Sequence, residues 1–272
     1  MNATTDSNSL QASIELNDHA VTLFQNGHYE QALLGFKHAM SVSQQTLEDT
    51  GSQAFAVRPA PVKLLDEAQS YPSLDPFMMM STSSNSGAEQ QQQHHHNDEE
   101  ERIYRRPIRF MVPSSPVAPV PTPILVSSGI IFNLALTMHV MSINGGGRRP
   151  SSSSSSNGKE DCGEQQDLSK PYQLYELSHQ CLQSYGENGE LLNQSPLFFL
   201  AIMNNMGMIH HQLQQVDYAQ VMFEKMIQLI MYYIDCGNYQ TLLGGRSNEE
   251  STACFFNNIK SFITSITTAP AA

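Results

Sequence analysis

Apolar residues recur at helical spacing in the first part of the chain, from Ile14 to about Ser43. Gly27 divides this stretch into two stripes, and the dipeptide Asn26-Gly27 is typical of a turn. The apolar positions are Leu16, Ala20, Leu23 and Phe24 in the first stripe, and Ala32, Leu33, Phe36, Ala39 and Met40 in the second. The pattern predicts two amphipathic helices that form a helical hairpin.

Helical spacing returns in the second half of the chain. The predicted helices are one that begins near residue 128, followed by 168–182, 197–213, 218–234 and 251–267. The segments 197–213 and 218–234 form the clearest helix pair, and a polar loop at 236–250 precedes the last helix.

Between these helical parts the composition does not favour folding. Residues 47–127 include the low-complexity run 90–101 and a Pro-x-Pro rhythm from Pro113 to Pro123, so only 104–112 resembles a short strand. The predicted organisation is a disordered tail at 1–12, a helix pair at 13–46, a mostly disordered insertion at 47–127, a helical part at 128–267 that contains a disordered loop at 144–166, and a tail at 268–272.

The helix pairs resemble one another. Their first helices align through Asn17-Asp18-His19-Ala20, Phe132-Asn133-Leu134-Ala135, Asn204-Asn205-Met206-Gly207 and Asn257-Asn258-Ile259-Lys260. Their second helices align through Ala32-x3-Phe36-x2-Ala39, Pro171-x3-Tyr175-x2-Ser178 and Ala219-x3-Phe223-x2-Met226. With these motifs the chain resembles the tetratricopeptide repeat (TPR), a 34-residue helix pair.

The resemblance implies an all-α fold, a short and irregular TPR-like superhelix with long disordered insertions. It assigns packing within and between repeats to Leu16, Ala20, Leu23, Ala32, Phe36, Ala39, Leu134, Ala135, Tyr175, Met206, Gly207, Ala219 and Phe223. Pro171 departs from the usual Ala, and a proline is acceptable there only in the first turn of the helix.

In TPR-like arrays the first helices line a concave groove. The candidate partner-binding residues are Asp18, Asn133, Asn205 and Asn258, which share one repeat position, together with His210. A side-chain amide offers both a donor and an acceptor, so it can hydrogen-bond the main chain of an extended peptide. The alternative is a structural asparagine that bonds the neighbouring repeat.

A different TPR mode captures a terminal carboxylate with paired cations. The positions that would have to be basic are Asn17, Ala201 and Asn205, so this mode is disfavoured. The chain has 272 residues and a formal charge of −12, which disfavours an acidic ligand and a nucleic-acid partner alike.

Other candidate chemistry is weak. His210 and His211 are adjacent on one helix, whereas metal ligands on a helix want a spacing of three or four residues. We expect no metal, no cofactor and no catalysis, because no phosphate loop, nucleophile elbow or zinc motif occurs. Ser151 and Ser152 follow two arginines and suit a basophilic kinase, although an unmodified linker explains them as well.

The apolar segment 124–143 is long enough to span a membrane, but Asn133 and His139 near its centre favour a buried core helix. The first residues resemble no secretory signal, and the four cysteines form no C-x-x-C pair. We therefore expect an intracellular protein, cytoplasmic or nuclear, with reduced thiols.

The sequence thus predicts a non-catalytic interaction module that binds a peptide or partner protein of unknown identity. The alternative is a scaffold or oligomerisation protein that assembles through exposed helices, and a homo-oligomer stays open. An enzyme of unrecognised type is a third hypothesis, for which no constellation of residues speaks.

Overall fold

The structure is a computed structural model, and it describes residues 3–49, 103–110, 121–145, 167–185, 196–237 and 249–268. Within these ranges the protein has seven helices and no strand, which confirms the predicted all-α class. The helices are α1 (Ala3–Gln25), α2 (Tyr29–Asp49), α5 (Pro123–Gly145), α6 (Ser169–Tyr185), α8 (Pro196–Gln212), α9 (Val216–Asp235) and α11 (Glu249–Thr268).

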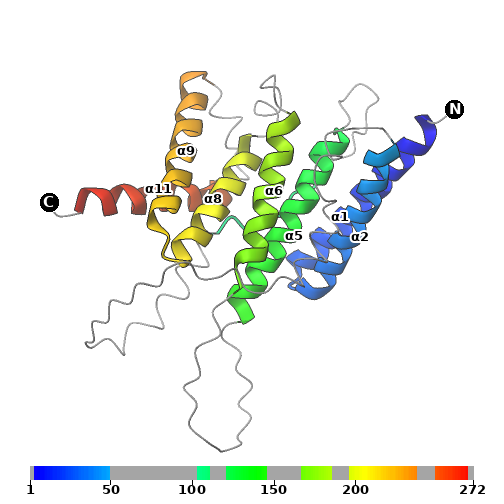
Figure 1. Ribbon diagram of the computed structural model, residues 1–272, viewed down its shortest axis with the longest axis horizontal. Helices are drawn as coiled ribbons and strands as arrows, with labels where there is room; N and C mark the ends of the chain where they lie inside the picture. The colour runs from blue at the N-terminus through cyan, green and yellow to red at the C-terminus, as the bar shows by residue number, and fades with distance from the viewer. Residues whose placement is uncertain are drawn as a thin grey trace, which may run out of the picture.

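The helices pack as adjacent pairs in chain order (Figure 1). The pairs are α1 with α2, α5 with α6, and α8 with α9. Helix α2 also packs on α5, and α6 packs on α8, so that the three pairs form one row. Helix α11 lies across the end of the row and contacts both α8 and α9 (Figure 1). This arrangement is compatible with a helical-repeat fold.

In the first pair and in the third pair, the two helices are connected by the same kind of turn. After α1 the amide of His28 donates to the carbonyl of Leu23 at 2.9 Å, and Gly27 has a φ of +78°. After α8 the amide of Gln215 donates to the carbonyl of His210 at 2.8 Å, and Gln214 has a φ of 58°. A residue in the left-handed region commonly ends a helix in this way, so Gln214 takes a conformation that Gly27 adopts without steric cost.

The predicted packing residues lie in the core. Ala20, Ala32, Phe36, Ala39, Leu134, Ala135 and Tyr175 are fully buried, Met206, Ala219 and Phe223 are at most 5% exposed, and Leu16 and Leu23 pack against them half-buried. Small residues permit the close approach within the first and third pairs. A Cβ added to Gly35 would lie 2.8 Å from that of Ala20, and one added to Gly207 would lie 2.9 Å from the ring of Phe223.

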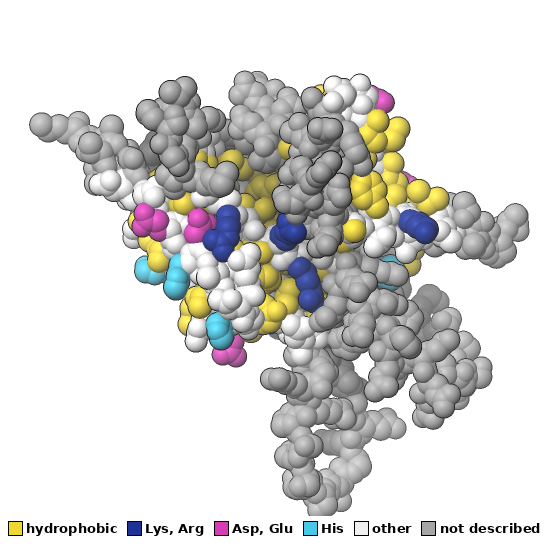
Figure 2. Space-filling view, turned by 180° about the vertical axis from the view of Figure 1, so that it is seen from behind, with side chains coloured by type: hydrophobic (Ala, Val, Ile, Leu, Met, Phe, Trp, Pro, Cys, Tyr) yellow, Lys and Arg dark blue, Asp and Glu magenta, His cyan; other side chains and the backbone are white. Residues whose placement is uncertain are grey.

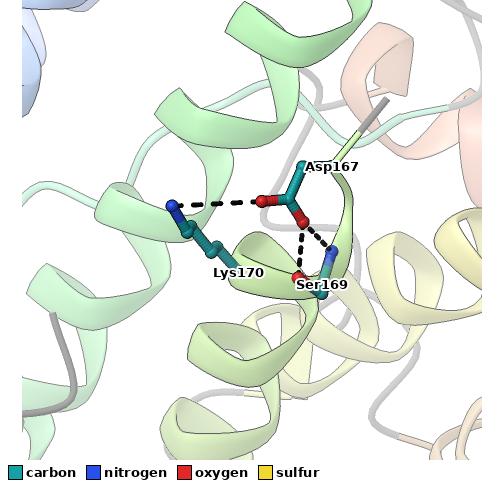
Figure 3. A network of polar contacts seen from close by, with 3 residues as sticks. All are labelled: Asp167, Ser169 and Lys170. Atoms are coloured by element: carbon teal, nitrogen blue, oxygen red, sulfur yellow. Dashed lines mark hydrogen bonds and ion pairs between the residues drawn. The ribbon is translucent and has the colours of Figure 1, made fainter. Parts of the chain in front are cut away.

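The start of α6 accommodates the unusual proline. Asp167 accepts hydrogen bonds from the amide and the hydroxyl of Ser169 and lies 3.9 Å from the ammonium group of Lys170 (Figure 3). A carboxylate at this position satisfies donors that a helix leaves free at its first turn. Pro171 falls within that first turn, where the absence of its N–H costs no helical hydrogen bond.

Helix α5 lies in the middle of the row. Its segment Pro123–Asn144 is long and apolar enough to cross a membrane, but 83% of the most apolar window is buried inside the protein. Burial against α2 and α6 accounts for its apolar character, as the sequence predicted for a core helix.

Several predicted boundaries need correction. The sequence predicts a disordered tail at 1–12, whereas α1 begins at Ala3 and Leu10 packs against the core. Helix α5 begins at Pro123, a residue suited to a helix start. Within the insertion, residues 103–110 have a defined, non-helical course and form no strand. Helix α2 runs to Asp49 and α5 runs to Gly145, beyond the predicted start of the insertion and of the loop. Most of the remaining predicted disorder and the serines Ser151 and Ser152 lie outside the described residues.

Candidate peptide-binding face

A short segment of the chain lies across the first helices of the pairs. Residues 103–110, here called the bound segment, contact α1, α5, α8 and α11 (Figure 1, blue-green). We call the surface that these four helices present to it the first-helix face. Ile103, Tyr104 and Phe110 are at most 7% exposed, so the segment shares the core of the protein.

At one end of the segment, Asn205 on α8 holds Tyr104 by its main chain. The amide of Tyr104 donates to Oδ1 of Asn205 at 2.9 Å, and Nδ2 of Asn205 donates to the carbonyl of Tyr104 at 3.1 Å. The same Nδ2 donates to the hydroxyl of Tyr175 at 3.0 Å. Asn205 therefore bonds both main-chain groups of one residue and is itself oriented by α6.

At the other end, Asn133 on α5 makes the same pair of bonds with Ile108. The amide of Ile108 donates to Oδ1 of Asn133 at 2.7 Å, and Nδ2 of Asn133 donates to the carbonyl of Ile108 at 2.9 Å. Asn17 on α1 donates to the same carbonyl at 3.0 Å and accepts from Nδ2 of Asn133 at 2.9 Å. Two neighbouring helices thus share the recognition of one peptide group.

Three side chains of the bound segment also have defined places. The ring of Tyr104 is stacked on Phe255 with centroids 5.3 Å apart, and Phe132 lies beside it at 6.5 Å. Phe110 packs against Gly129, where an added Cβ would lie only 2.3 Å from the ring. Arg109 donates to Thr22 at 3.1 Å and to Gln25 at 2.8 Å, both on α1.

The end of the face at Tyr104 and Phe255 is buried. Burial raises the pKa of the Tyr104 phenol to about 12, although the charge of Arg106 opposes the shift. Burial likewise raises the pKa of the Cys254 thiol, one helical turn from Asn258, to about 12. Burial is the main cause of both shifts, so the phenol of Tyr104 and the thiol of Cys254 lie in an apolar environment where the segment meets α11.

The predicted partner-binding residues divide into two groups. Asn133 and Asn205 hydrogen-bond the main chain of the bound segment, as the first interpretation expected, but the peptide belongs to the same chain. Asn258 donates to Asn204 on the neighbouring first helix at 2.7 Å. This bond corresponds to the alternative interpretation, a structural asparagine that bonds the neighbouring repeat. Asp18 does not contact the segment through a described bond and accepts from Asn17 at 3.2 Å instead.

His210 lies away from the bound segment. Its Nδ1 is 2.7 Å from the side-chain oxygen of Gln215, and its ring lies between Tyr172 and Tyr218. The residue therefore closes the turn between α8 and α9. The sequence predicts that His210 binds a partner in the groove, but its side-chain contacts with Gln215, Tyr172 and Tyr218 do not favour this role.

His139 is a buried histidine on α5, near the bound segment. Its Nε2 lies 3.3 Å from Oε1 of Gln212, and its ring contacts Tyr175 edge to face. Burial lowers the pKa of His139 to about 4, and the charge of Arg105 acts in the same direction, so the ring is neutral at pH 7.

Sequence reasoning missed three parts of the site. Asn17 was considered only as a position for a basic residue, yet it completes the binding of Ile108. Asn204, in the equivalent register, orients Asn205 through a bond of 3.2 Å. Gly129 was overlooked because its role depends on contact with a residue nineteen positions earlier in the chain. The paired Asn-Asp and Asn-Asn dipeptides were the available signal.

No group of three or more histidine, cysteine or acidic side chains suited to a metal ion occurs among the described residues. The three cysteines among the described residues, Cys181, Cys236 and Cys254, form no disulfide with one another. A comparison of the chain with protein-family models, with curated proteins and with solved structures gives no match.

Proposed function

We propose that the protein is a non-catalytic, TPR-like interaction module that binds an extended peptide or partner segment across its first-helix face. The repeat assignment is supported by equivalent features in the first and third pairs. Gly27 and Gln214 occupy the same turn position, and the aligned residues Ala20 and Gly207 both approach the second helix of their pair closely, Ala20 at Gly35 and Gly207 at Met222 and Phe223. These features lie where the TPR resemblance expects turn and packing residues.

A single observation carries the proposed role. Asn133 and Asn205 each bond both main-chain groups of one residue of an eight-residue segment, at distances of 2.7–3.1 Å. Side chains that bond the main chain recognise a peptide whatever side chains it bears. The proposed partner is therefore a protein or peptide. Nucleic acid, membrane, metal and cofactor have no part in the proposal, and neither has catalysis.

A peptide added in trans tests this proposal. Ile108→Pro in the full chain removes the amide that donates to Asn133 and should loosen the bound segment without removing Tyr104 or Phe110. A fluorescent peptide with the sequence of residues 101–112 should then bind with saturable anisotropy. Adding Asn133→Ala and Asn205→Ala should abolish this binding. Asn257→Ala, which changes an exposed residue on α11, serves as the control variant.

If neither this peptide nor any other peptide tested binds a folded Ile108→Pro chain, the first-helix face is not a peptide-binding site. Circular dichroism establishes that the variant is folded. The bound segment would then be only a structural strap that fixes the row of helices.

Assembly through exposed helices is the second candidate, and the outer surface of α9 favours it. Tyr218, Met231 and Tyr232 are 64%, 51% and 54% exposed. Figure 2 shows hydrophobic side chains gathered on the side of the molecule where α9 lies. Light scattering that shows a concentration-dependent oligomer, dispersed by Met231→Ser with Tyr232→Ser, would support this function.

A further inference from the structure

We propose that the first-helix face selects segments with two aromatic residues six positions apart. We further propose that its outside ligand is a segment of another protein with this pattern, which replaces residues 103–110. The inference rests on the proposed function and adds the sequence class of the partner. The bound segment, Ile103-Tyr104-Arg105-Arg106-Pro107-Ile108-Arg109-Phe110, provides the template.

The main-chain bonds fix the register. Tyr104 and Ile108 are four residues apart, and each is bonded through its N–H and its C=O. A proline at either position would lose the N–H that an asparagine accepts and leave a buried acceptor without its donor. Proline is acceptable between them, since Pro107 occupies such a position in the bound segment.

The aromatic side chains fix the sequence. The first aromatic residue stacks on Phe255, and an aromatic pair of this kind is favourable beyond its buried area. The second aromatic residue fills the place opposite Gly129, which is available only because this position lacks a Cβ. Both Tyr104 and Phe110 are at most 7% exposed, so truncation of either leaves a cavity in a packed core.

The residue before the second aromatic adds a smaller preference. Arg109 bonds the neutral side chains of Thr22 and Gln25 in an exposed position, and such bonds contribute less than buried ones. The preferred ligand therefore reads aromatic, three residues, aliphatic, arginine, aromatic.

The tether decides when an outside segment binds. The bound segment belongs to the same chain and competes as an intramolecular ligand, whose effective concentration is on the order of millimolar. An outside segment at micromolar concentration therefore gains access when the bound segment is weakened or when its own contacts are better. This argument also disfavours exchange of the same segment between two copies at micromolar concentration, because identical contacts then lack the advantage of the tether.

The test uses peptides on the full chain, as wild type and as Ile108→Pro. The peptides are the sequence of residues 101–112, its Tyr104→Ala, Phe110→Ala and Arg109→Ala versions, and a scrambled version of the same composition. Anisotropy should show binding to the Ile108→Pro chain at least tenfold tighter than to wild type. Either aromatic truncation should weaken binding at least tenfold, and the arginine truncation two- to fivefold.

The outcomes separate this inference from the proposed function. Equal binding of the scrambled and truncated peptides would overturn the sequence pattern, while peptide binding itself would stand. Absence of binding by every peptide would overturn both. Light scattering on the same samples detects segment exchange, and a stable dimer of wild type that Asn133→Ala disperses would identify a second copy, not another protein, as the occupant.

Discussion

Two parts of the first-helix face carry asparagine at the same repeat position and use it differently. On α5 and α8, Asn133 and Asn205 bond the main chain of the bound segment. On α11, Asn258 bonds Asn204 of the preceding first helix, and the segment meets this helix through the ring of Phe255. A shared repeat position therefore indicates a buried amide, and the neighbouring chain decides which partner the amide takes.

The difference has a physical origin. A buried amide must bond whatever polar group is nearest, because an unsatisfied one costs about 1–3 kcal/mol. Beside α5 and α8 that group is a peptide unit of the bound segment. Beside α11 the nearest polar group is the side chain of Asn204. Helix α11 therefore meets α8 through a hydrogen bond and meets the bound segment through the apolar ring of Phe255.

The largest expected effect comes from removing both main-chain contacts. Asn133→Ala with Asn205→Ala leaves the amide and carbonyl of Tyr104 and the amide of Ile108 without partners, while Asn17 still donates to the carbonyl of Ile108. The double change should lower the free energy of unfolding by about 4 kcal/mol. Urea denaturation measures the loss. Asn257→Ala, an exposed asparagine on α11, should change stability by less than about 0.5 kcal/mol. Equal effects of the two changes would break the comparison.

The second largest effect on stability should come from lowering the pH, through His139 on α5. The pKa of His139 is about 4 in the folded protein and 6.5 when exposed, so the unfolded chain binds the proton more readily between these values. The free energy of unfolding should therefore fall by up to about 3 kcal/mol as the pH falls from 6.5 to 4.

His139→Gln should flatten this dependence. The matched control is His211→Gln, because His211 is exposed on the surface of α8. Urea denaturation at several pH values gives the slope for each variant. Identical slopes in wild type and His139→Gln would contradict the assignment.

A methyl group added at position 129 should displace the ring of Phe110. Gly129→Ala brings a Cβ to 2.3 Å from the ring of Phe110 and should cost about 1–3 kcal/mol. Gly35→Ala crowds Ala20 instead, at 2.8 Å, without touching the segment. Limited proteolysis should cut near residues 103–110 faster in the first variant and not in the second.

The smallest effect should come from the α11 asparagine. Asn258→Ala removes one side-chain bond to Asn204 and should cost about 1 kcal/mol, with peptide binding to the Ile108→Pro chain changed less than twofold. A loss of peptide binding as large as that of Asn133→Ala would place Asn258 with the main-chain-binding residues and remove the distinction between the two parts.

The sequence predicted most of the helices and the packing residues, because helical periodicity and the repeat pattern depend on local spacing. It also placed Asn133 and Asn205 on a surface able to bond a peptide main chain. It did not predict that residues 103–110 occupy that surface, since contacts such as Tyr104 with Asn205 join positions 101 residues apart. Periodicity carries no information about such pairs.

Composition also misled at this segment. Within a mostly disordered insertion, residues 104–112 were predicted as a short strand, but the described part of this segment forms no strand, and its apolar residues Ile103, Tyr104, Ile108 and Phe110 are the ones that the helices bury or partly bury. The tail at 1–12 was misjudged for a similar reason, because its polar residues hid the packing of Leu10.

Amide hydrogen exchange resolved at single residues tests the central claim most directly. The amides of Tyr104 and Ile108 should exchange slowly in wild type, because each donates to a buried asparagine oxygen. Asn205→Ala should accelerate the amide of Tyr104 most, and Asn133→Ala that of Ile108. Exchange of both amides in wild type at the rate of an unstructured peptide would contradict the account.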